Sequence, residues 1–228
     1  MIEPAQLPGS PLDLSLCFSY DDDLAGSPYT EALERWTVEV FHRPPRGAAD
    51  EQGLSTETVG SMVFWRVNLE RGDAFGALEE ESEDLAEIAH ILLDMKSGTF
   101  HSEVSGHLPY AGSALLIMDR VSLTAPWRGW GLGYWLAAEA MRRLMPGCRA
   151  IACVPGISDL SAAQLRDRAE WERVRARITD GWRRLGFWHF CNDVHLLSPT
   201  SLELETQLDV LRGRAVMLAT EHHMDPNR

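Results

Sequence analysis

The chain has 228 residues, of which 45% are apolar, so it is long enough to bury a hydrophobic core, and we expect one domain over residues 1–228. Its formal net charge of −13 opposes a nucleic-acid partner, because the protein would repel a phosphate backbone. No uncharged apolar run approaches the length that spans a membrane, so no membrane association is expected.

The ends of the chain and the cysteines predict a cytoplasmic protein. The N-terminal sequence lacks the basic and apolar regions of a secretory signal. Within the single domain, residues 1–30 read as a loop-rich extension and residues 219–228 as a flexible tail. The four cysteines, Cys17, Cys148, Cys153 and Cys191, form no CxxC pair, so we expect reduced thiols.

The N-terminal half predicts three strands and one helix. An apolar segment at 12–20 reads as a strand. Apolar and polar residues alternate over 35–43 and again over 58–69, which indicates a two-stranded antiparallel ribbon joined by a long loop. Apolar residues at helical spacing over 73–94 predict one amphipathic helix with a strongly acidic outer face.

The C-terminal half predicts three strand regions and three helices. The segment 114–124 carries the most continuous apolar run of the chain, so we expect it to lie in the centre of its sheet. Gly186 is expected to end the long helix. The other expected elements are a helix over 133–145 closed by Pro146 and Gly147, a buried strand over 148–154, a helix over 161–185 capped by Ser158 or Ser161, a strand region over 189–199 and a helix over 201–213.

Three glycines stand between the strand at 114–124 and the helix that follows it. The sequence there is "VSLTAPWRGWGLGYWLAAEAMRRL", residues 121–144. A glycine-rich turn at the start of a helix leaves backbone N–H groups pointing outward, where they bind an anion such as a phosphate. Neither GxxxxGK[ST] nor a GxGxxG dinucleotide motif is present. The alternative is a tight turn without a ligand, in which the glycines only allow positive φ.

Two landmarks in this half resemble the GNAT-type N-acetyltransferases. "RGWGLG" (128–133) has the form R-x-x-G-x-G of that family's coenzyme A pyrophosphate loop, and "WRRLGF" (182–187) resembles its aromatic residue followed, after three residues, by Gly-Phe. The resemblance covers residues 114–198. It implies an α/β (α+β) fold with a mixed, mostly antiparallel central sheet flanked by helices and splayed between the strands 114–124 and 148–154. The N-terminal half departs from the family, because its acidic helix comes after the third strand.

The resemblance implies acetyl-coenzyme A as cosubstrate and no metal. The pyrophosphate would lie on the N–H groups of residues 129–134, and the pantetheine arm along the strand that ends at Leu123 and Thr124. The N–H of Leu123 resembles the family's oxyanion donor, and we expect Arg128 to contribute more by its backbone than by its guanidinium. The cofactor-binding residues implied are Leu123, Arg128, Gly129, Trp130, Gly131, Leu132, Gly133 and Tyr134.

The proton carriers are harder to assign. Trp182 stands where the family often has a tyrosine acid, and an indole supplies no proton at neutral pH. Strand alternation puts Ile117, Asp119, Val121 and Leu123 on one face, which makes Asp119 the candidate base; alternatively it pairs with an arginine or faces solvent. His189 and Cys191 are further candidates near the thioester, or ordinary core and rim residues.

The function expected from these features is transfer of an acetyl group from acetyl-coenzyme A to a primary amine by direct attack in a ternary complex. The acidic run 79–87 would attract a cationic acceptor, either a small molecule or a peptide amine, or it is only a solvated helix face. The alternatives are a catalytically silent acyl-coenzyme A-binding or regulatory protein and transfer of a longer acyl group. Homodimerisation through a strand or the terminal helix is left open.

Overall fold

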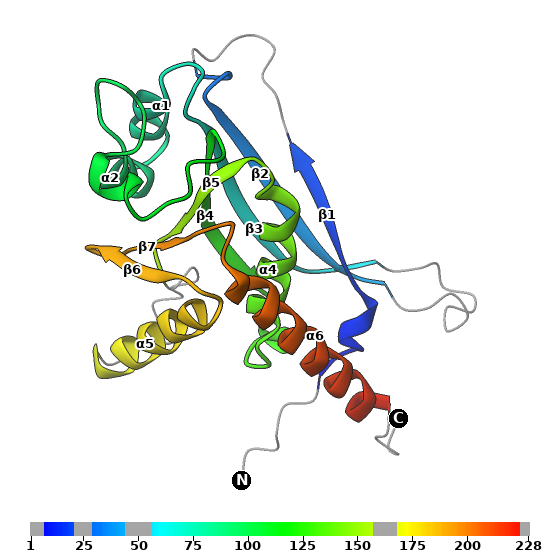
Figure 1. Ribbon diagram of the computed structural model, residues 1–228. Helices are drawn as coiled ribbons and strands as arrows, with labels where there is room; N and C mark the ends of the chain where they lie inside the picture. The colour runs from blue at the N-terminus through cyan, green and yellow to red at the C-terminus, as the bar shows by residue number, and fades with distance from the viewer. Residues whose placement is uncertain (1–6, 21–28, 44–55, 157–167, 224–228) are drawn as a thin grey trace.

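The computed structural model describes residues 7–20, 29–43, 56–156 and 168–223. Within these residues seven strands form one open sheet in the order β1-β2-β3-β4-β5-β7-β6 (Figure 1). All neighbours are antiparallel except β4 and β5, which are parallel. The strands are β1 (Leu14–Tyr20), β2 (Leu33–His42), β3 (Glu57–Asn68), β4 (Ala114–Leu123), β5 (Cys148–Cys153), β6 (Trp188–Cys191) and β7 (Val194–Leu197). The expectation of a mixed, mostly antiparallel sheet is confirmed.

Helices cover both faces of this sheet. Apolar residues of α4, α6 and the end of α5 share one buried cluster with one face of the sheet. Those of α1, α2 and α3 form a second cluster on the other face. The helices of the described residues are α1 (Ala74–Glu81), α2 (Glu83–Leu92), α3 (Ser102–Ser105), α4 (Leu132–Leu144), α5 (Arg168–Arg184) and α6 (Leu202–His223), with 3-10 turns η1 (Pro11–Asp13) and η2 (Ala125–Trp127). None of these helices combines the length and the apolar composition needed to cross a lipid bilayer.

Strand β4 is the centre of the molecule, as its apolar run predicts. It is the fourth of the seven strands. Leu116 and Met118 belong to the cluster under α4 and α6, whereas Leu115 and Ile117 belong to the cluster under α1 and α2. Because both faces of its first half, Ala114 to Met118, are buried, the side chains there are apolar without alternation.

The pairing of β4 with β5 stops half-way along β4. It runs from Ala114 opposite Cys148 to Met118 opposite Cys153. On its other side, β4 stays paired with β3 as far as Leu123. Among the described residues, the last part of β4 therefore has no strand partner on the β5 side. We call this the free edge of β4, and it positions the site described below.

The helix predicted at 133–145 is confirmed as α4, and its end is held by β3. Arg66 of β3 donates from Nη1 to the carbonyl oxygen of Leu144 at 2.8 Å and from Nη2 to that of Pro146 at 2.9 Å. Gly147 follows with a positive φ of 78°. These bonds satisfy carbonyl groups that the last helical turn leaves without a partner.

The single helix predicted over 73–94 is wrong, because two helices occupy this segment. Ser82 between α1 and α2 adopts an extended backbone, with φ −164° and ψ 159°. Its Oγ accepts a hydrogen bond from the N–H of Leu85 at 3.3 Å, so Ser82 caps the N-terminus of α2. Helical spacing of the apolar residues is similar on both sides of the break, which is why the pattern reads as one helix.

The other differences from the predicted elements concern the C-terminal region. The strand region at 189–199 is a hairpin, β6 and β7, whose turn contains Asn192 with φ 49°. The terminal helix extends to His223, so residues 219–223 are helical and not part of a tail; Ala219 is buried. Gly186 does follow the end of α5, but the proposed caps Ser158 and Ser161 lie outside the described residues.

A bidentate ion pair joins α4 to α6. Arg212 of α6 donates from Nε and Nη2 to the two carboxylate oxygens of Glu139 at 2.7 and 3.0 Å. Trp135 adds a hydrogen bond from Nε1 to Oε1 of Glu139 at 3.3 Å. Burial is the largest single influence and raises the pKa of Glu139, but the hydrogen bonds and charge of Arg212, with the hydrogen bond from Trp135 and the charge of Arg142, together lower this pKa below its usual value.

We expect Glu139→Gln to lower the free energy of unfolding at pH 7 by about 1 kcal/mol, since the partly buried pair is lost. The pKa of Glu139 is lower in the folded than in the unfolded protein. The contribution of the pair is therefore complete above the unfolded-state pKa and disappears as the pH falls through the folded-state value. Urea denaturation of both proteins should show a gap at pH 7 that closes in acid. Equal stabilities at pH 7 would contradict this role.

Candidate functional site

The free edge of β4 borders a cleft of about 580 Å³. One wall is formed by the glycine-rich loop and the first turn of α4, and the others by α5 and α6. A cleft of this size accommodates a small-molecule ligand or cofactor. The site therefore lies where two strands of the sheet separate and three helices converge.

Backbone groups of β4 point into this cleft. Thr124 donates its N–H to the carbonyl oxygen of Val59 on β3 at 2.8 Å. Successive residues of an antiparallel strand direct their N–H and C=O groups to alternate sides, so those of Leu123 and Val121 point away from β3. The carbonyl of Leu123 accepts a hydrogen bond from Nε of Arg128. The N–H of Leu123 is directed towards the cleft, where the family resemblance implies an oxyanion donor.

The N-terminus of α4 opens onto the same cleft. Gly129 and Gly131 have φ values of 85° and 81°, a left-handed conformation that glycine adopts without strain. Gly131 is the N-cap residue, and as a glycine it has no side chain to accept from the first helical N–H groups. These N–H groups and the partial positive charge of the helix end form a favourable environment for an anion.

In the part of the chain that the structure describes, neither backbone conformation nor packing requires a glycine at position 133. Gly133 is the second residue of α4, and its φ is not positive. A Cβ atom placed on it would lie 3.9 Å from side-chain atoms of Leu123 and Val121, which is ordinary contact. A ligand that comes close to the backbone would account for the missing side chain.

Most of the predicted cofactor-binding residues line the cleft. Trp130 is the exception, because its side chain packs against the core cluster and does not line the cleft. The residues that the structure brings together are Leu123, Arg128, Gly129, Gly131, Leu132, Gly133 and Tyr134. The side chain of Arg128 is bonded to the backbone of β4, as described above, so its guanidinium helps to fix the loop.

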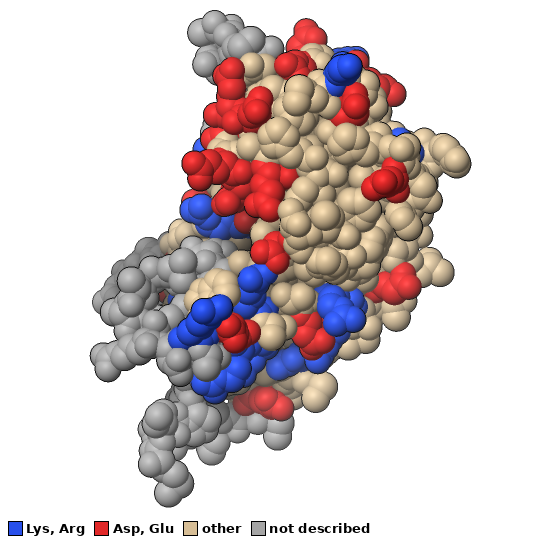
Figure 2. Space-filling view, turned by 90° about the vertical axis from the view of Figure 1, so that its left-hand side faces the viewer, with Lys and Arg blue, Asp and Glu red and all other residues tan. Residues whose placement is uncertain are grey.

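The cleft is cationic although the protein is acidic. Arginines 128, 177, 184 and 214 line it, and Asp119 is the one acidic residue among its described lining residues. Figure 2 shows basic side chains gathered below acidic ones on the face turned towards the viewer. In a chain of net charge −13, four arginines around one cleft favour an anionic ligand.

Sequence reasoning missed the wall contributed by α6. Its cleft-lining residues are Gln207, Val210, Leu211 and Arg214. Their spacing of three, one and three residues indicates one helical face, but periodicity alone does not say what that face contacts. Arg177 and Arg184 of α5 also line the cleft.

Two aromatic side chains, Tyr134 and Trp182, line the cleft. The rings of Tyr134 and Trp182 meet edge to face with centroids 4.9 Å apart, and Phe187 packs against Trp182 at 6.0 Å. Gly181 makes room for this arrangement, because a Cβ on it would lie 2.2 Å from Cζ of Tyr134. Burial raises the pKa of Tyr134, so its phenol keeps its proton at neutral pH.

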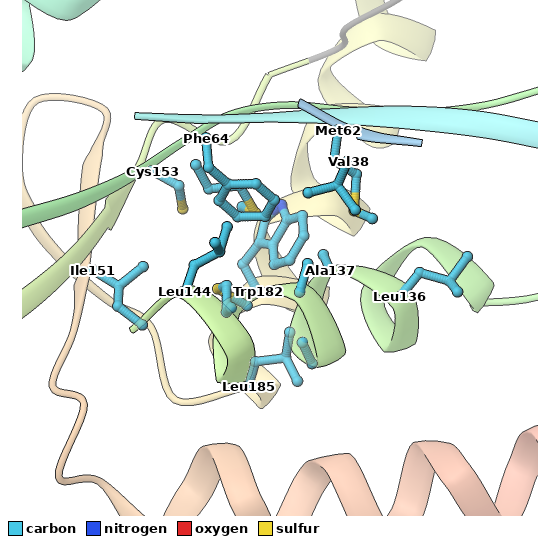
Figure 3. Close-up of a cluster of buried hydrophobic side chains, with 14 of the residues drawn as sticks. Val38, Met62, Phe64, Leu136, Ala137, Leu144, Ile151, Cys153, Trp182 and Leu185 are labelled. Carbon is cyan, nitrogen blue, oxygen red and sulfur yellow. The ribbon is translucent and has the colours of Figure 1, made fainter. Parts of the chain in front are cut away.

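Trp182 itself is a core residue. It is 6% exposed and belongs to the cluster beneath α4. Figure 3 shows it among Phe64, Leu144 and Leu185. Trp182 therefore packs in the core and stabilises the part of the cleft wall that it forms.

The prediction that Asp119 shares a face with Val121 and Leu123 is wrong. The register of β3 and β4 shifts at Asp119, so that Met118 pairs with Phe64 and Arg120 with Val63. This bulge interrupts the alternation. Val121 and Leu123 pack with the cluster under α4, whereas Asp119 accepts a hydrogen bond from Trp65 Nε1 at 3.3 Å, and Trp65 lies in the opposite cluster. Asp119 still lines the cleft at its β4 end and is exposed.

The other predicted chemical groups lie elsewhere. His189 and Cys191 are exposed residues of β6 that do not line the cleft. All four cysteines are unpaired, as expected. Burial raises the pKa of Cys148 to about 11 and that of Cys153 still further, so neither is a thiolate at neutral pH. In the described residues, no three His, Cys, Asp or Glu side chains come together as a metal site.

Comparison of the chain with protein-family models, with curated proteins and with solved structures gives no match.

Proposed function

We propose that the cleft binds acetyl-coenzyme A and that the protein transfers the acetyl group to a primary amine. The observation that carries this proposal is the coincidence, in one cleft, of an uncapped glycine-rich helix N-terminus, a free strand edge and four arginines. Coenzyme A has the matching parts, since it joins an anionic pyrophosphate to a pantetheine arm with two amides. The end of the β4–β5 pairing at Met118 is compatible with the splay that the family resemblance implies.

Each part of the cofactor would have hydrogen-bonding partners in the cleft. The pyrophosphate would accept hydrogen bonds from the N–H groups at the start of α4, including that of Gly133, where no side chain blocks its approach. The amides of the pantetheine arm would bond to the outward backbone groups of Val121 and Leu123, as an added strand does. This orientation directs the thioester along β4.

The chemistry follows from this placement. A neutral amine attacks the thioester carbonyl, a C–N bond forms, and the N–H of Leu123 stabilises the developing oxyanion. The C–S bond then breaks, the nitrogen gives up a proton, and the coenzyme A thiolate takes one up from solvent. Asp119 is the acidic side chain that lines the cleft, and we assign the base to it, with water as the link to the amine where needed.

We expect Asp119→Asn to lower turnover by about 100-fold or more, the usual size of a general-base contribution, and to leave acetyl-coenzyme A affinity unchanged. Asparagine keeps an oxygen that accepts from Trp65 Nε1, so the bulge should persist. The assay is thiol release from acetyl-coenzyme A with a panel of polyamines, aminoglycosides, and lysine and N-terminal peptides. If Asp119→Asn has the melting temperature and the turnover of the wild type, Asp119 is not the general base.

A coenzyme A-binding protein without transferase activity is the second candidate. It is favoured by Trp182, which is buried and aromatic at the position where the family often has a tyrosine acid. The same panel distinguishes the two functions. Thiol release with at least one amine supports the transferase, whereas saturable cofactor binding without release on every amine supports the binding protein.

A further inference from the structure

Helix α6 adds a wall to the cleft that lies outside the segment resembling the acetyltransferases. That segment ends at residue 198, and α6 begins at Leu202. Arg212 of α6 is fixed to Glu139 of α4 by two hydrogen bonds. Arg214, two residues further along, is therefore presented from an anchored helix, and it lines the cleft.

The guanidinium of Arg214 lies next to the backbone of Gly131. A Cβ on Gly131 would be 3.3 Å from Nη1 and 3.5 Å from Cζ of Arg214. In the part of the chain that the structure describes, no hydrogen bond or ion pair engages this guanidinium. A group with five N–H donors thus faces the helix N-terminus with its hydrogen-bonding capacity available.

This juxtaposition is electrostatically unfavourable on its own. The N-terminus of α4 carries partial positive charge, and a cation near it is repelled. Arg214 adds a full positive charge on the side of the N-cap residue Gly131 where a Cβ would stand. An anion that accepts hydrogen bonds from both groups converts the repulsion into two attractions. The cleft beside them, lined by three more arginines, provides the space for such an anion.

We infer that Arg214 binds the pyrophosphate of the cofactor, closing over it from α6 while the first N–H groups of α4 hold it from below. This inference rests on the proposed function. Arginine suits the role because its planar fork donates two parallel hydrogen bonds to phosphate oxygens. Arg214 is exposed, so a substitution there removes the charge with little effect on the core.

The test is a calorimetric titration of coenzyme A into the full chain and into Arg214→Gln. We expect the variant to bind about tenfold more weakly, since one charge-assisted contact is lost. Its affinity should also depend less on salt than that of the wild type. Arg214→Lys should recover part of the affinity, because the charge returns without the fork. Melting temperatures of the variants should equal that of the wild type.

Arg143→Gln is the matched control. Arg143 is an exposed arginine in the last turn of the same helix α4, its side chain is absent from the cleft lining, and its substitution removes the same charge. It should leave the affinity unchanged. If Arg143→Gln and Arg214→Gln weaken binding equally, the effect comes from net charge and the inference is overturned.

Titration of a second ligand, 3′-dephospho-coenzyme A, shows which phosphate of the cofactor Arg214 contacts. With 3′-dephospho-coenzyme A, Arg214→Gln should cost the same factor as with coenzyme A, because the pyrophosphate is present in both. A loss that disappears with 3′-dephospho-coenzyme A would assign Arg214 to the 3′-phosphate and overturn the pyrophosphate contact. Full affinity of Arg214→Gln would defeat the inference and leave the proposed function standing. No binding to the wild type would instead defeat the proposed function.

Discussion

Gly133→Glu is expected to abolish coenzyme A binding while leaving the protein folded. A side chain at this position leaves the backbone towards Leu123 and Val121, which border the cleft, and nothing nearer than 3.9 Å prevents it from being built. The carboxylate would then occupy the place of the pyrophosphate. Losing two charge-assisted hydrogen bonds of about 1.5–3 kcal/mol each corresponds to an affinity loss of about 100-fold or more.

The helix should tolerate this substitution. Gly133 is the second residue of α4, and an acidic side chain in the first turn interacts favourably with the helix dipole. Replacing a helical glycine also removes a destabilising residue. We therefore expect a melting temperature equal to or higher than that of the wild type, together with the loss of binding.

Gly133→Ala is the control for this experiment. Its methyl group has room, adds no charge and should stabilise α4, so affinity should fall far less than in Gly133→Glu. Calorimetric titration of coenzyme A into both variants measures the difference. Wild-type affinity in a folded Gly133→Glu variant would show that the ligand does not approach α4 here.

Trp182→Ala is expected to cause the largest loss of stability. Trp182 is 6% exposed and packs against Tyr134 and Phe187. Truncating a buried tryptophan to alanine lowers the free energy of unfolding by about 3–5 kcal/mol, because apolar contacts are lost and a cavity remains. Domains are typically stable by only about 5–15 kcal/mol, so this is a large fraction. Urea denaturation of wild type and variant gives the value.

Trp182→Phe is the control, because it shortens the side chain but keeps an aromatic ring at this position. Phenylalanine keeps an aromatic ring between Tyr134 and Phe187, so we expect less than half of the destabilisation caused by alanine. If Trp182→Ala changed the free energy of unfolding by less than about 1 kcal/mol, the packing of Trp182 would not stabilise the core beside the cleft.

The sheet was predictable because its pattern is local. Alternation over 35–43 and 58–69 marked β2 and β3, and the unbroken apolar run at 114–124 marked β4 as central. The lining of the cleft was predictable in part, since the glycines of residues 129–133 mark a turn before a helix, and most of the residues named around them line the cleft. These signals need only neighbours in the sequence.

What the sequence did not reveal depends on distant contacts. The bulge at Asp119 is set by the register with β3, and a single extra residue reverses the faces that alternation predicts. The break at Ser82 left a weak signal, a serine before two acidic residues, which is typical of a helix start. The position of Arg214 beside Gly131 follows from the packing of α6 on α4, which periodicity cannot foresee.

Calorimetric titration of acetyl-coenzyme A into the purified full chain tests whether the cleft between β4 and α5 binds this cofactor, as we propose. Desulfo-coenzyme A and adenosine diphosphate serve as comparisons, the first lacking the thiol and the second the pantetheine arm. We expect saturable binding of acetyl-coenzyme A with one molecule per chain, similar binding of desulfo-coenzyme A, and weaker binding of adenosine diphosphate. If the folded protein gives no saturable binding, the proposed function is wrong and the glycines of 129–133 form only a turn.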